Sequence, residues 1–513
     1  MTQPYHLTAS QAQAKFKDGS LTVEEYAKSI LSRIQTRDST VNAWAYLNPD
    51  LVLRRARELD QTVPQKRGPL HGVAIGVKDV IHTKDMPTQY NSIIYEGDTP
   101  RVDAGSIAIL RSNGALIFGK TTTTEFAATT VGPSYKGPKT TNPHGPKRTP
   151  GGSSSGSGAA VGDLQVPIGL GTQTVGSTIR PGSFNGIYAM KPTWNAITRE
   201  GQKLYSLILD TLGLYARSID DLKLLLDAFQ VIDDNPIQPF SIAGSKFALL
   251  TFPTPAWPEM GPGTVAALKK SAELLRAHGA NVEEIPLPFM FHKMYTHHML
   301  VLSADGRTAF LPEYTTSKSS LDPLLISHVE NHAGHTRKAQ LAALDELAAM
   351  RPRFDALADQ YAAILAPSVV DEAPVGLETT GEAAICAPWT AMHMPVVNVP
   401  GFKGESGMPV GVSLVTSRFR DQYLLSVAKE VGRVFEAEGG WRRELPGTGF
   451  NMKHYLRLGA HILVLHALPI DLGQGREKLG GDFIARPLHT RRSRLGLSIM
   501  DPRTSDQWSE SKS

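Results

Sequence analysis

The 513-residue sequence contains a single cysteine, Cys386. One cysteine cannot form an intrachain disulfide, which excludes the disulfide-stapled scaffolds of secreted proteins. No apolar run approaches the roughly 18 to 20 residues that a membrane-spanning helix needs. Residues 1–20 also lack the basic-then-apolar order of a signal peptide. We therefore expect a cytoplasmic protein with no membrane partner.

The sequence also lacks an excess of charge of one sign over most of its length. The formal net charge is +4, but residues 441–513 alone hold 12 Lys and Arg against 7 Asp and Glu, so the rest of the chain is close to neutral. A near-neutral body does not attract polyanions, so we expect no nucleic-acid partner. The 16 histidines show no metal-ligand spacing such as H-E-x-x-H, so we expect no metal either.

What the chain does contain is a large apolar fraction, 41%, with segments of helix and strand in alternation. Capping boxes at Thr8 and Thr22 predict two early helices, and residues 72–79 predict a buried strand. Residues 247–287 predict a β-α-β unit, and a final helix is expected near residues 421–437. This alternation favours an α/β fold around a mixed sheet.

Residues 447–513 differ in character from the rest. Basic clusters and a polar end surround one short apolar patch, HILVLHALPI. We expect a domain of residues 1–446 followed by a poorly ordered basic tail, unless the tail reflects an imperfect gene model.

The segment GALIFGKT (114–121) satisfies the phosphate-loop pattern G-x-x-x-x-G-K-[ST]. Its inner positions are apolar, which indicates a buried strand instead of a loop around phosphates. A short helix, capped by Ser106 and ended by Asn113 and Gly114, is expected before it. We interpret the segment as a core strand, with Lys120 and Thr121 at its exit.

A second segment, GSSSG (152–156), satisfies the G-x-S-x-G nucleophile elbow. That elbow needs a strand leading straight into it. The residues before it, NPHGPKRTP, contain Pro143, Pro146 and Pro150, which exclude a central strand. An α/β-hydrolase elbow is therefore not expected here.

The chemistry that remains lies in two serine- and glycine-rich loops and in Lys78, which follows the apolar segment GVAIGV. Small and apolar neighbours indicate that both loops pack against a core. A lysine at the end of a buried strand loses solvation, which lowers its pKa from about 10.4 by several units. A neutral amine of this kind can take a proton from a hydroxyl.

These segments carry a resemblance to a known family. The chain resembles the amidase signature family over roughly residues 5–446, on the motifs GPLHGVAIGVKD (68–79), PGGSSSGS (150–157), GTQTVGSTIRP (171–181) and GIYAMKPT (186–193). The resemblance implies a single large α/β domain, with a central mixed sheet of about eleven strands surrounded by helices. It also implies hydrolysis of a carboxamide through a Ser-cisSer-Lys triad, with no cofactor and no metal.

The resemblance assigns roles residue by residue. Lys78 matches the catalytic lysine, and Ser177 matches the nucleophile that forms the acyl-enzyme. Ser153 matches the bridging serine, which family members hold through a cis peptide and which also contacts the substrate. The oxyanion hole would consist of backbone N–H groups of Thr174, Val175, Gly176 and Ser177.

Two positions depart from the common family pattern. Val175 stands where the family has glycine, so either the loop has adapted to valine or a positive φ there strains it and impairs activity. Arg180 follows the nucleophile by three places, similar to malonamidase-type members in which this arginine binds a substrate carboxylate. The alternative for Arg180 is a pairing with a structural carboxylate.

Three functions remain open from the sequence. The first is an amidohydrolase that acts on a small-molecule amide, with or without a free carboxylate, as a monomer or a homodimer. The second is an amidotransferase subunit of the glutamyl-tRNA type. The third is a non-catalytic family member that serves as a binding protein, for which Val175 is the only support.

Overall fold

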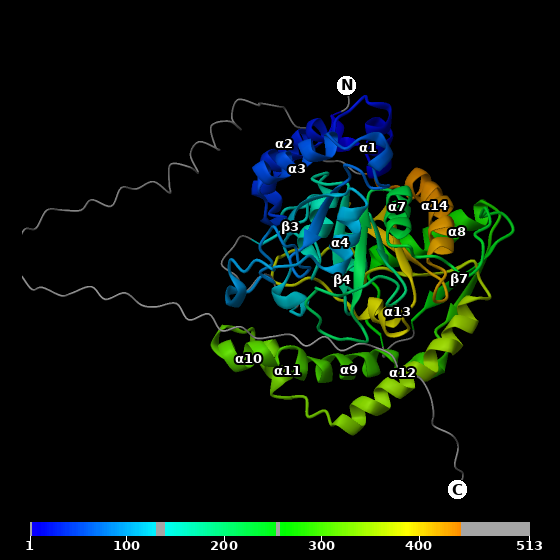
Figure 1. The fold of residues 1–513 in the computed structure, drawn as a ribbon. Coiled ribbons are helices and arrows are strands. Elements are labelled where there is room, and N and C mark those ends of the chain that lie inside the picture. The colour runs from blue at the N-terminus through cyan, green and yellow to red at the C-terminus, as the bar shows by residue number, and fades with distance from the viewer. Residues whose placement is uncertain (1–2, 130–138, 253–256, 443–513) are drawn as a thin grey trace, which may run out of the picture. The chain divides into compact units, whose positions relative to one another are not determined.

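A mixed sheet of eleven strands lies at the centre of the part of the chain that the structure describes (Figure 1). The structure is a computed structural model, and it describes residues 3–129, 139–252 and 257–442. These residues form one large α/β domain, as the sequence predicts. The segment predicted to be a tail, residues 447–513, lies outside the described residues.

The strands follow the spatial order β1-β3-β2-β4-β6-β5-β10-β11-β9-β7-β8. Their bounds are Trp44–Tyr46 (β1), Ala74–Lys78 (β2), Leu116–Thr121 (β3), Ile168–Gln173 (β4), Tyr188–Lys191 (β5), Thr211–Ala216 (β6), Lys246–Thr251 (β7), Asn281–Pro286 (β8), Ala363–Pro367 (β9), Val396–Lys403 (β10) and Pro409–Val415 (β11). The three strands β3, β2 and β4 run parallel, as do β9, β7 and β8. The remaining neighbours pair antiparallel.

Within the described residues, fourteen α-helices accompany the sheet. Their bounds are Ala9–Asp18 (α1), Val23–Val41 (α2), Pro49–Asp60 (α3), Gly105–Ser112 (α4), Ser155–Gly162 (α5), Ile179–Phe184 (α6), Ile219–Ala228 (α7), Pro262–Ala277 (α8), Met294–Ala309 (α9), Leu311–Ser317 (α10), Pro323–Val329 (α11), Arg337–Ala358 (α12), Ala387–Ala391 (α13) and Asp421–Glu438 (α14). None of them combines the length and the hydropathy that a membrane crossing requires.

Local sequence signals account for several of these boundaries. Both capping boxes form, at Thr8 before α1 and at Thr22 before α2, because each threonine accepts the N–H of the third helical residue. Gly19 ends α1 in the left-handed conformation, with φ +77°. The predicted β-α-β unit is β7-α8-β8, and its two strands pair in parallel.

Helices cover both faces of the sheet. A Cβ added to Gly182 in α6 would lie 2.3 Å from the Cβ of Ala189, and one added to Gly432 in α14 would lie 2.4 Å from the Tyr188 hydroxyl. Because neighbouring residues of a strand point to opposite faces, α6 and α14 pack on opposite sides of β5. Helix α6 includes the end of the motif GTQTVGSTIRP and directly follows the loop that holds Ser177.

Helix α5 consists of serine, glycine, alanine and valine only, and seven of its residues are buried. A Cβ on Gly156 would come within 2.3 Å of the Ala43 carbonyl oxygen and 2.4 Å of the Thr122 nitrogen. Small residues are therefore needed for the helix backbone to approach β3. This explains the serine- and glycine-rich composition, which in another context is typical of a linker.

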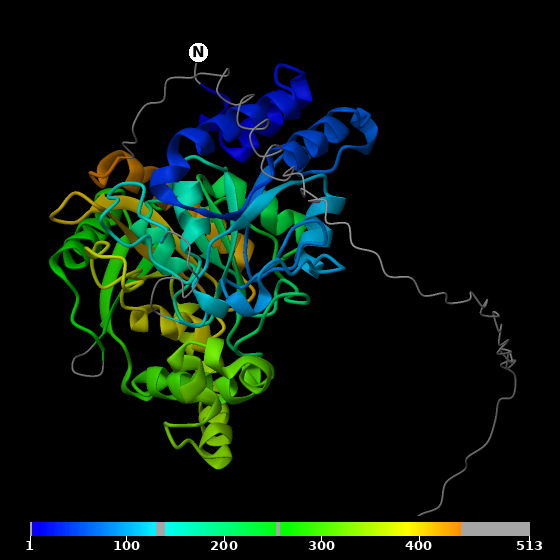
Figure 2. The same cartoon turned by 90° about the vertical axis from the view of Figure 1, so that its left-hand side faces the viewer.

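Four consecutive helices, α9 to α12, interrupt the predicted alternation of strands and helices. They lie together at one end of the described domain, and α1 to α3 lie at the other (Figures 1 and 2). On α12 the buried residues Leu347, Met350 and Phe354 recur at intervals of three and four, as in an amphipathic helix. This helix was not among the elements predicted from the sequence.

The segment GALIFGKT forms a strand, as predicted. The chain runs from α4 through Gly114, at φ +87°, into β3. Lys120 and Thr121 are its last two residues, as predicted, and both are buried. One detail of the prediction is wrong: Ser106 lies inside α4, whose N-cap is Ala104.

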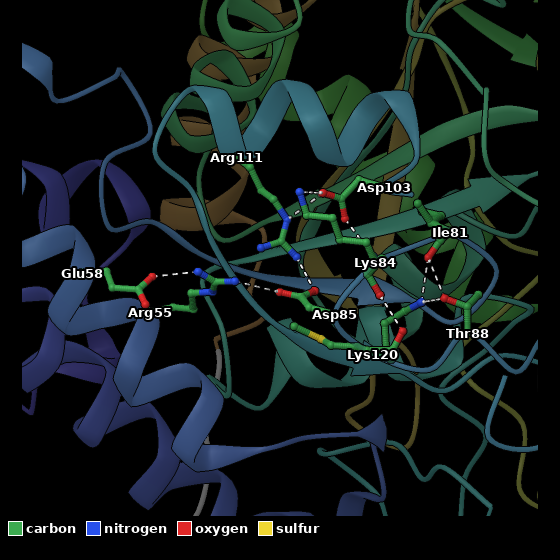
Figure 3. Close-up of polar contacts among 11 residues, drawn as sticks. Arg55, Glu58, Ile81, Lys84, Asp85, Thr88, Asp103, Arg111 and Lys120 are labelled. Atoms are coloured by element: carbon green, nitrogen blue, oxygen red, sulfur yellow. Dashed lines mark hydrogen bonds and ion pairs between the residues drawn. The ribbon is translucent and has the colours of Figure 1, made fainter. Parts of the chain in front are cut away.

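Lys120 is held by polar groups of the loop that follows β2 (Figure 3). Its Nζ donates to the Ile81 carbonyl at 2.7 Å and to the Thr88 hydroxyl at 2.6 Å, and it lies 3.5 Å from the Asp79 carboxylate. Burial lowers the pKa of Lys120 to about 8 and raises the pKa of Asp79 to about 6. This lysine is thus a structural ion-pair partner, with all its donors directed into the protein.

We expect Lys120→Met to lower the free energy of unfolding by about 3 to 5 kcal/mol, because Asp79 would remain buried without its cation. Urea unfolding of the variant would measure this loss, and Asp79→Asn in the same chain should recover part of it. Mg-ATP should leave the melting temperature of the wild type unchanged. A rise of several degrees with Mg-ATP that disappears in Lys120→Met would contradict this interpretation.

Candidate active site

Lys78 is the last residue of β2, and its side chain is fully buried. β2 lies between β3 and β4, so strands enclose the lysine on both sides. The Nζ atom donates to the Ser153 hydroxyl at 2.7 Å and to the Thr172 hydroxyl at 2.8 Å. The structure therefore joins the predicted lysine and the predicted bridging serine.

Burial lowers the pKa of Lys78 well below its usual range, because the charged ammonium loses its solvation. The buried carboxylate of Asp210 acts in the opposite direction and raises it. The two groups that touch Nζ are neutral hydroxyls, which satisfy its hydrogen bonds without adding charge. A lysine in this environment loses its proton more readily than an exposed lysine does.

Ser153 follows a cis peptide bond, Gly152–Ser153, as the resemblance implies. The serines after it hold the loop against β4. The Ser154 hydroxyl lies 3.2 Å from both the nitrogen and the carbonyl oxygen of Thr172, and the Ser157 hydroxyl donates to the Leu170 carbonyl at 2.7 Å. The hydrogen bonds of Ser154 and Ser157 to β4 thus hold the loop in which Ser153 contacts Lys78.

Ser177 lies in the loop between β4 and α6 and is 9% exposed. Its hydroxyl makes no hydrogen bond to the described residues, so it stays available to a substrate. The carbonyls of this loop are occupied: Thr390 donates to Val175 O at 3.0 Å, the Arg180 N–H donates to Gly176 O at 3.0 Å, and Tyr215 donates to Ser177 O at 3.0 Å.

The N–H groups of Val175, Gly176 and Ser177 have no hydrogen-bond partner in the described part of the chain. The loop is fixed where it enters α6. The Gln173 side-chain oxygen accepts the N–H groups of Thr178 and Ile179 at 2.9 and 3.0 Å. A loop with engaged carbonyls and free N–H groups can stabilise a negative oxygen.

Val175 does not adopt a positive φ, and neither does Gly176. The strain considered for valine at this position is therefore absent, and the Val175 side chain packs against the core. At Gly176 space is tight, since a Cβ there would lie 3.0 Å from the Cβ of Cys386. Cys386 is fully buried, as expected for a packed side chain, and burial raises its pKa to about 12.

Arg180 is 3% exposed, and its guanidinium contacts the serine loop. It donates to the Gly152 carbonyl at 2.6 Å, to the Gly381 carbonyl at 2.6 Å and to the Thr380 hydroxyl at 3.0 Å. Its Nε is buried without a partner. No described carboxylate forms an ion pair with it, and the charge of Glu382 acts on it only through space.

Three polar residues of this site were not predicted from the sequence: Thr172, Asp210 and Thr390. Thr172 lies within the motif GTQT, but its contact with Lys78 depends on the pairing of β2 with β4, which the sequence does not show. Asp210 and Thr390 come from distant segments and carry no local signal. Among the described residues, no group of three or more His, Cys, Asp or Glu side chains could hold a metal ion.

Residues 25–425 match the family model described as Amidase. The chain belongs to the amidase signature family. Among curated relatives of this amidase-family protein, a glutamyl-tRNA(Gln) amidotransferase subunit from Chloroflexus aurantiacus is 30% identical over 491 residues, which cover 87% of this chain and 99% of the relative.

Solved structures of the family share the fold. A crystal structure of an amidase superimposes with a TM-score of 0.75 at 26% identity, covering 85% of this chain and 100% of the other. The native peptide amidase of Stenotrophomonas maltophilia gives a TM-score of 0.71 at 25% identity, with 86% and 98% covered. The predicted family and fold are thus confirmed.

Proposed function

We propose that this protein is an amidohydrolase that cleaves a small carboxamide to a carboxylate and ammonia or an amine, through an acyl-enzyme on Ser177. The observation that carries the proposal is the 2.7 Å hydrogen bond between Lys78 Nζ and the Ser153 hydroxyl in a fully buried setting. A buried lysine with no carboxylate in contact can act as a general base, and Ser153 is its connection to a nucleophile.

In the first half-reaction, the Ser177 oxygen attacks the amide carbon as its proton passes to Ser153 and the Ser153 proton passes to neutral Lys78. A hydroxyl can accept one proton while it donates another, which suits Ser153 to this transfer. The tetrahedral intermediate then breaks its C–N bond, and the same relay returns the proton to the leaving nitrogen. Water, activated in the same way, hydrolyses the ester.

The developing negative oxygen needs donors. We assign this function to the backbone N–H groups of the nucleophile loop, Thr174, Val175, Gly176 and Ser177, of which the last three lack partners among the described residues. One such donor contributes about 3 to 4 kcal/mol to the transition state. The bonds to the loop carbonyls hold the backbone that carries these N–H groups in place.

Arg180 supports a more specific substrate class. A guanidinium remains charged in proteins, and a buried charge without a counter-charge is costly. Arg180 is buried next to Ser153 and has no carboxylate partner among the described residues. A substrate carboxylate would supply the missing charge, so we infer that the amide carries one and that Arg180 and Ser153 contact the substrate.

A fluorophosphonate probe tests the proposal without knowledge of the substrate. We expect covalent labelling at Ser177, located by peptide mass spectrometry, and no labelling in Ser177→Ala. A panel of small amides with and without a free carboxylate would then identify the substrate class. Failure of the folded wild type to react with the probe would contradict the proposed chemistry.

The activity should rise from acid through neutral into alkaline pH. The base must be neutral, and burial lowers the pKa of Lys78 from its usual value, so the acid limb of kcat/KM should report this lowered pKa. Initial rates from pH 5 to 10 would measure the limb. A profile with its maximum near pH 5 would indicate carboxylate or histidine chemistry instead.

The curated relatives favour a second candidate, an amidotransferase subunit of the glutamyl-tRNA type. The relative from Chloroflexus aurantiacus is 30% identical and bears such a name. Two features count against an amidotransferase subunit: the near-neutral charge of residues 1–440 and the position of Arg180, three residues after Ser177. Hydrolysis of a small amide by the purified chain alone favours the first candidate, and activity that requires partner subunits and charged tRNA favours the second.

The non-catalytic alternative loses its support, since Val175 is unstrained and Lys78, Ser153 and Ser177 are all present. A homodimer and a cytoplasmic location remain predictions. Size-exclusion chromatography with light scattering and cell fractionation would check them.

A further inference from the structure

Asp210 lies immediately before β6, beside the nucleophile loop. β4 and β6 run antiparallel, with Gln173 opposite Thr211. In an antiparallel pair, the residue after Gln173 comes beside the residue before Thr211. The contact is direct, because the Thr174 hydroxyl donates to Asp210 Oδ1 at 2.6 Å. The Asp210 carboxylate is therefore hydrogen-bonded to the loop that carries Ser177.

The Asp210 carboxylate is 3% exposed and has no ion-pair partner among the described residues. Its second oxygen accepts the Tyr205 N–H at 2.7 Å. The Arg199 guanidinium donates to the backbone carbonyl of Asp210 at 2.9 Å, not to its carboxylate. A buried carboxylate held by neutral donors only is costly, and such groups are concentrated at functional sites.

Four ionisable side chains surround Asp210 and Thr174. Through space, the Arg199 charge lowers the pKa of Asp210, and the Asp210 charge raises the pKa of Lys78. Tyr205 and His298 are neutral near pH 7, since burial raises the pKa of Tyr205 and lowers the pKa of His298 to about 4. Burial raises the pKa of Asp210 to about 6, so the carboxylate is mainly negative at neutral pH.

We propose that Asp210 is a positioning residue for the reaction at Ser177, which holds Thr174 so that the loop N–H groups stay aligned and which places a negative charge near Lys78. This inference rests on the proposed function, because it requires Ser177 as nucleophile and Lys78 as base. Thr174 is the link between Asp210 and the loop: its hydroxyl binds the carboxylate, and its backbone begins the oxyanion loop.

The rate of fluorophosphonate labelling at Ser177, measured against pH in the full-length protein, tests the inference. We expect Asp210→Asn to slow labelling by about 10-fold or more, because the oxyanion donors lose alignment. Its acid midpoint should also move to lower pH, by about half a unit or more, because protonated Lys78 loses a stabilising negative charge. A purely structural role for Asp210 would not move the midpoint in this direction.

Matched variants separate the two effects. Thr174→Val removes the hydroxyl and keeps the carboxylate, so labelling should slow without the downward shift of the midpoint. Thr174→Ser keeps a donor for the Asp210 carboxylate and should label faster than Thr174→Val. Asp221→Asn removes another buried carboxylate, which accepts N–H groups of Ala9 and Ser10 at the start of α1, and should leave rate and midpoint unchanged.

Wild-type rate and midpoint in Asp210→Asn would overturn the inference while the proposed function stands. If circular dichroism shows that Asp210→Asn does not fold, the Thr174 pair decides: equal labelling rates for the valine and serine variants would overturn it. If the wild type itself is not labelled at Ser177, the proposed function fails, and the inference falls with it.

Discussion

Replacement of Ser177 or Lys78 by alanine should lower kcat/KM for the amide substrate by about 10⁴-fold or more. Ser177→Ala removes the atom that forms the acyl bond. Lys78→Ala removes the only amine that touches the Ser153 hydroxyl among the described residues. Steady-state rates of the purified variants, with circular dichroism to confirm folding, would measure the losses.

The three residues should act as one unit. Because they form a single relay, the double variant Ser177→Ala/Lys78→Ala should be little worse than either single variant. Ser153→Ala should retain a trace of activity, since water can occupy part of the relay. Ser155→Ala provides the matched control, because this neighbouring serine makes only a 3.5 Å contact with the Thr122 carbonyl and should leave activity near the wild-type level. Near-normal activity of a folded Lys78→Ala protein would contradict the mechanism.

Arg180→Ala should lower kcat/KM for a carboxylate-bearing amide about 10- to 100-fold more than for a neutral amide of the same size. A hydrogen bond between charged groups contributes about 1.5 to 3 kcal/mol, and only the carboxylate substrate loses it. Both substrates should share a further loss, since Arg180 also holds the Gly152 and Gly381 carbonyls. The informative measurement is therefore the ratio of the two kcat/KM values.

Arg148→Ala is the matched control for this ratio. Arg148 also donates to a loop carbonyl, that of Ala373, but its guanidinium already has a carboxylate, Glu372, at 3.3 Å. Its removal should affect both amides alike. If Arg180→Ala lowers kcat/KM equally for both amides, Arg180 does not bind a substrate carboxylate. Its role would then be to hold the serine loop.

The sequence by itself determined the family and the local elements of this protein. Capping at Thr8 and Thr22 depends on residues three positions apart, so short-range pattern was sufficient for α1 and α2. The apolar residues of β3 likewise predicted a strand, although the segment GALIFGKT matches the phosphate-loop pattern. Lys78, Ser153 and Ser177 were identified by their resemblance to family motifs. A motif indicates which residues react, but it does not give the distances between them. The run of four helices from α9 to α12 was missed although its periodicity is present in the sequence.

Only the tertiary structure decided how the site is charged. The buried strand before Lys78 predicted the direction of its pKa shift, but the enclosure of Lys78 by β3 and β4 depends on the order in which strands pair, which no short segment encodes. The partners of Arg180 and the contact of Asp210 with Thr174 join residues 28 to 201 positions apart. Burial and long-range contacts set protonation and alignment, and these depend on the packing of the whole domain.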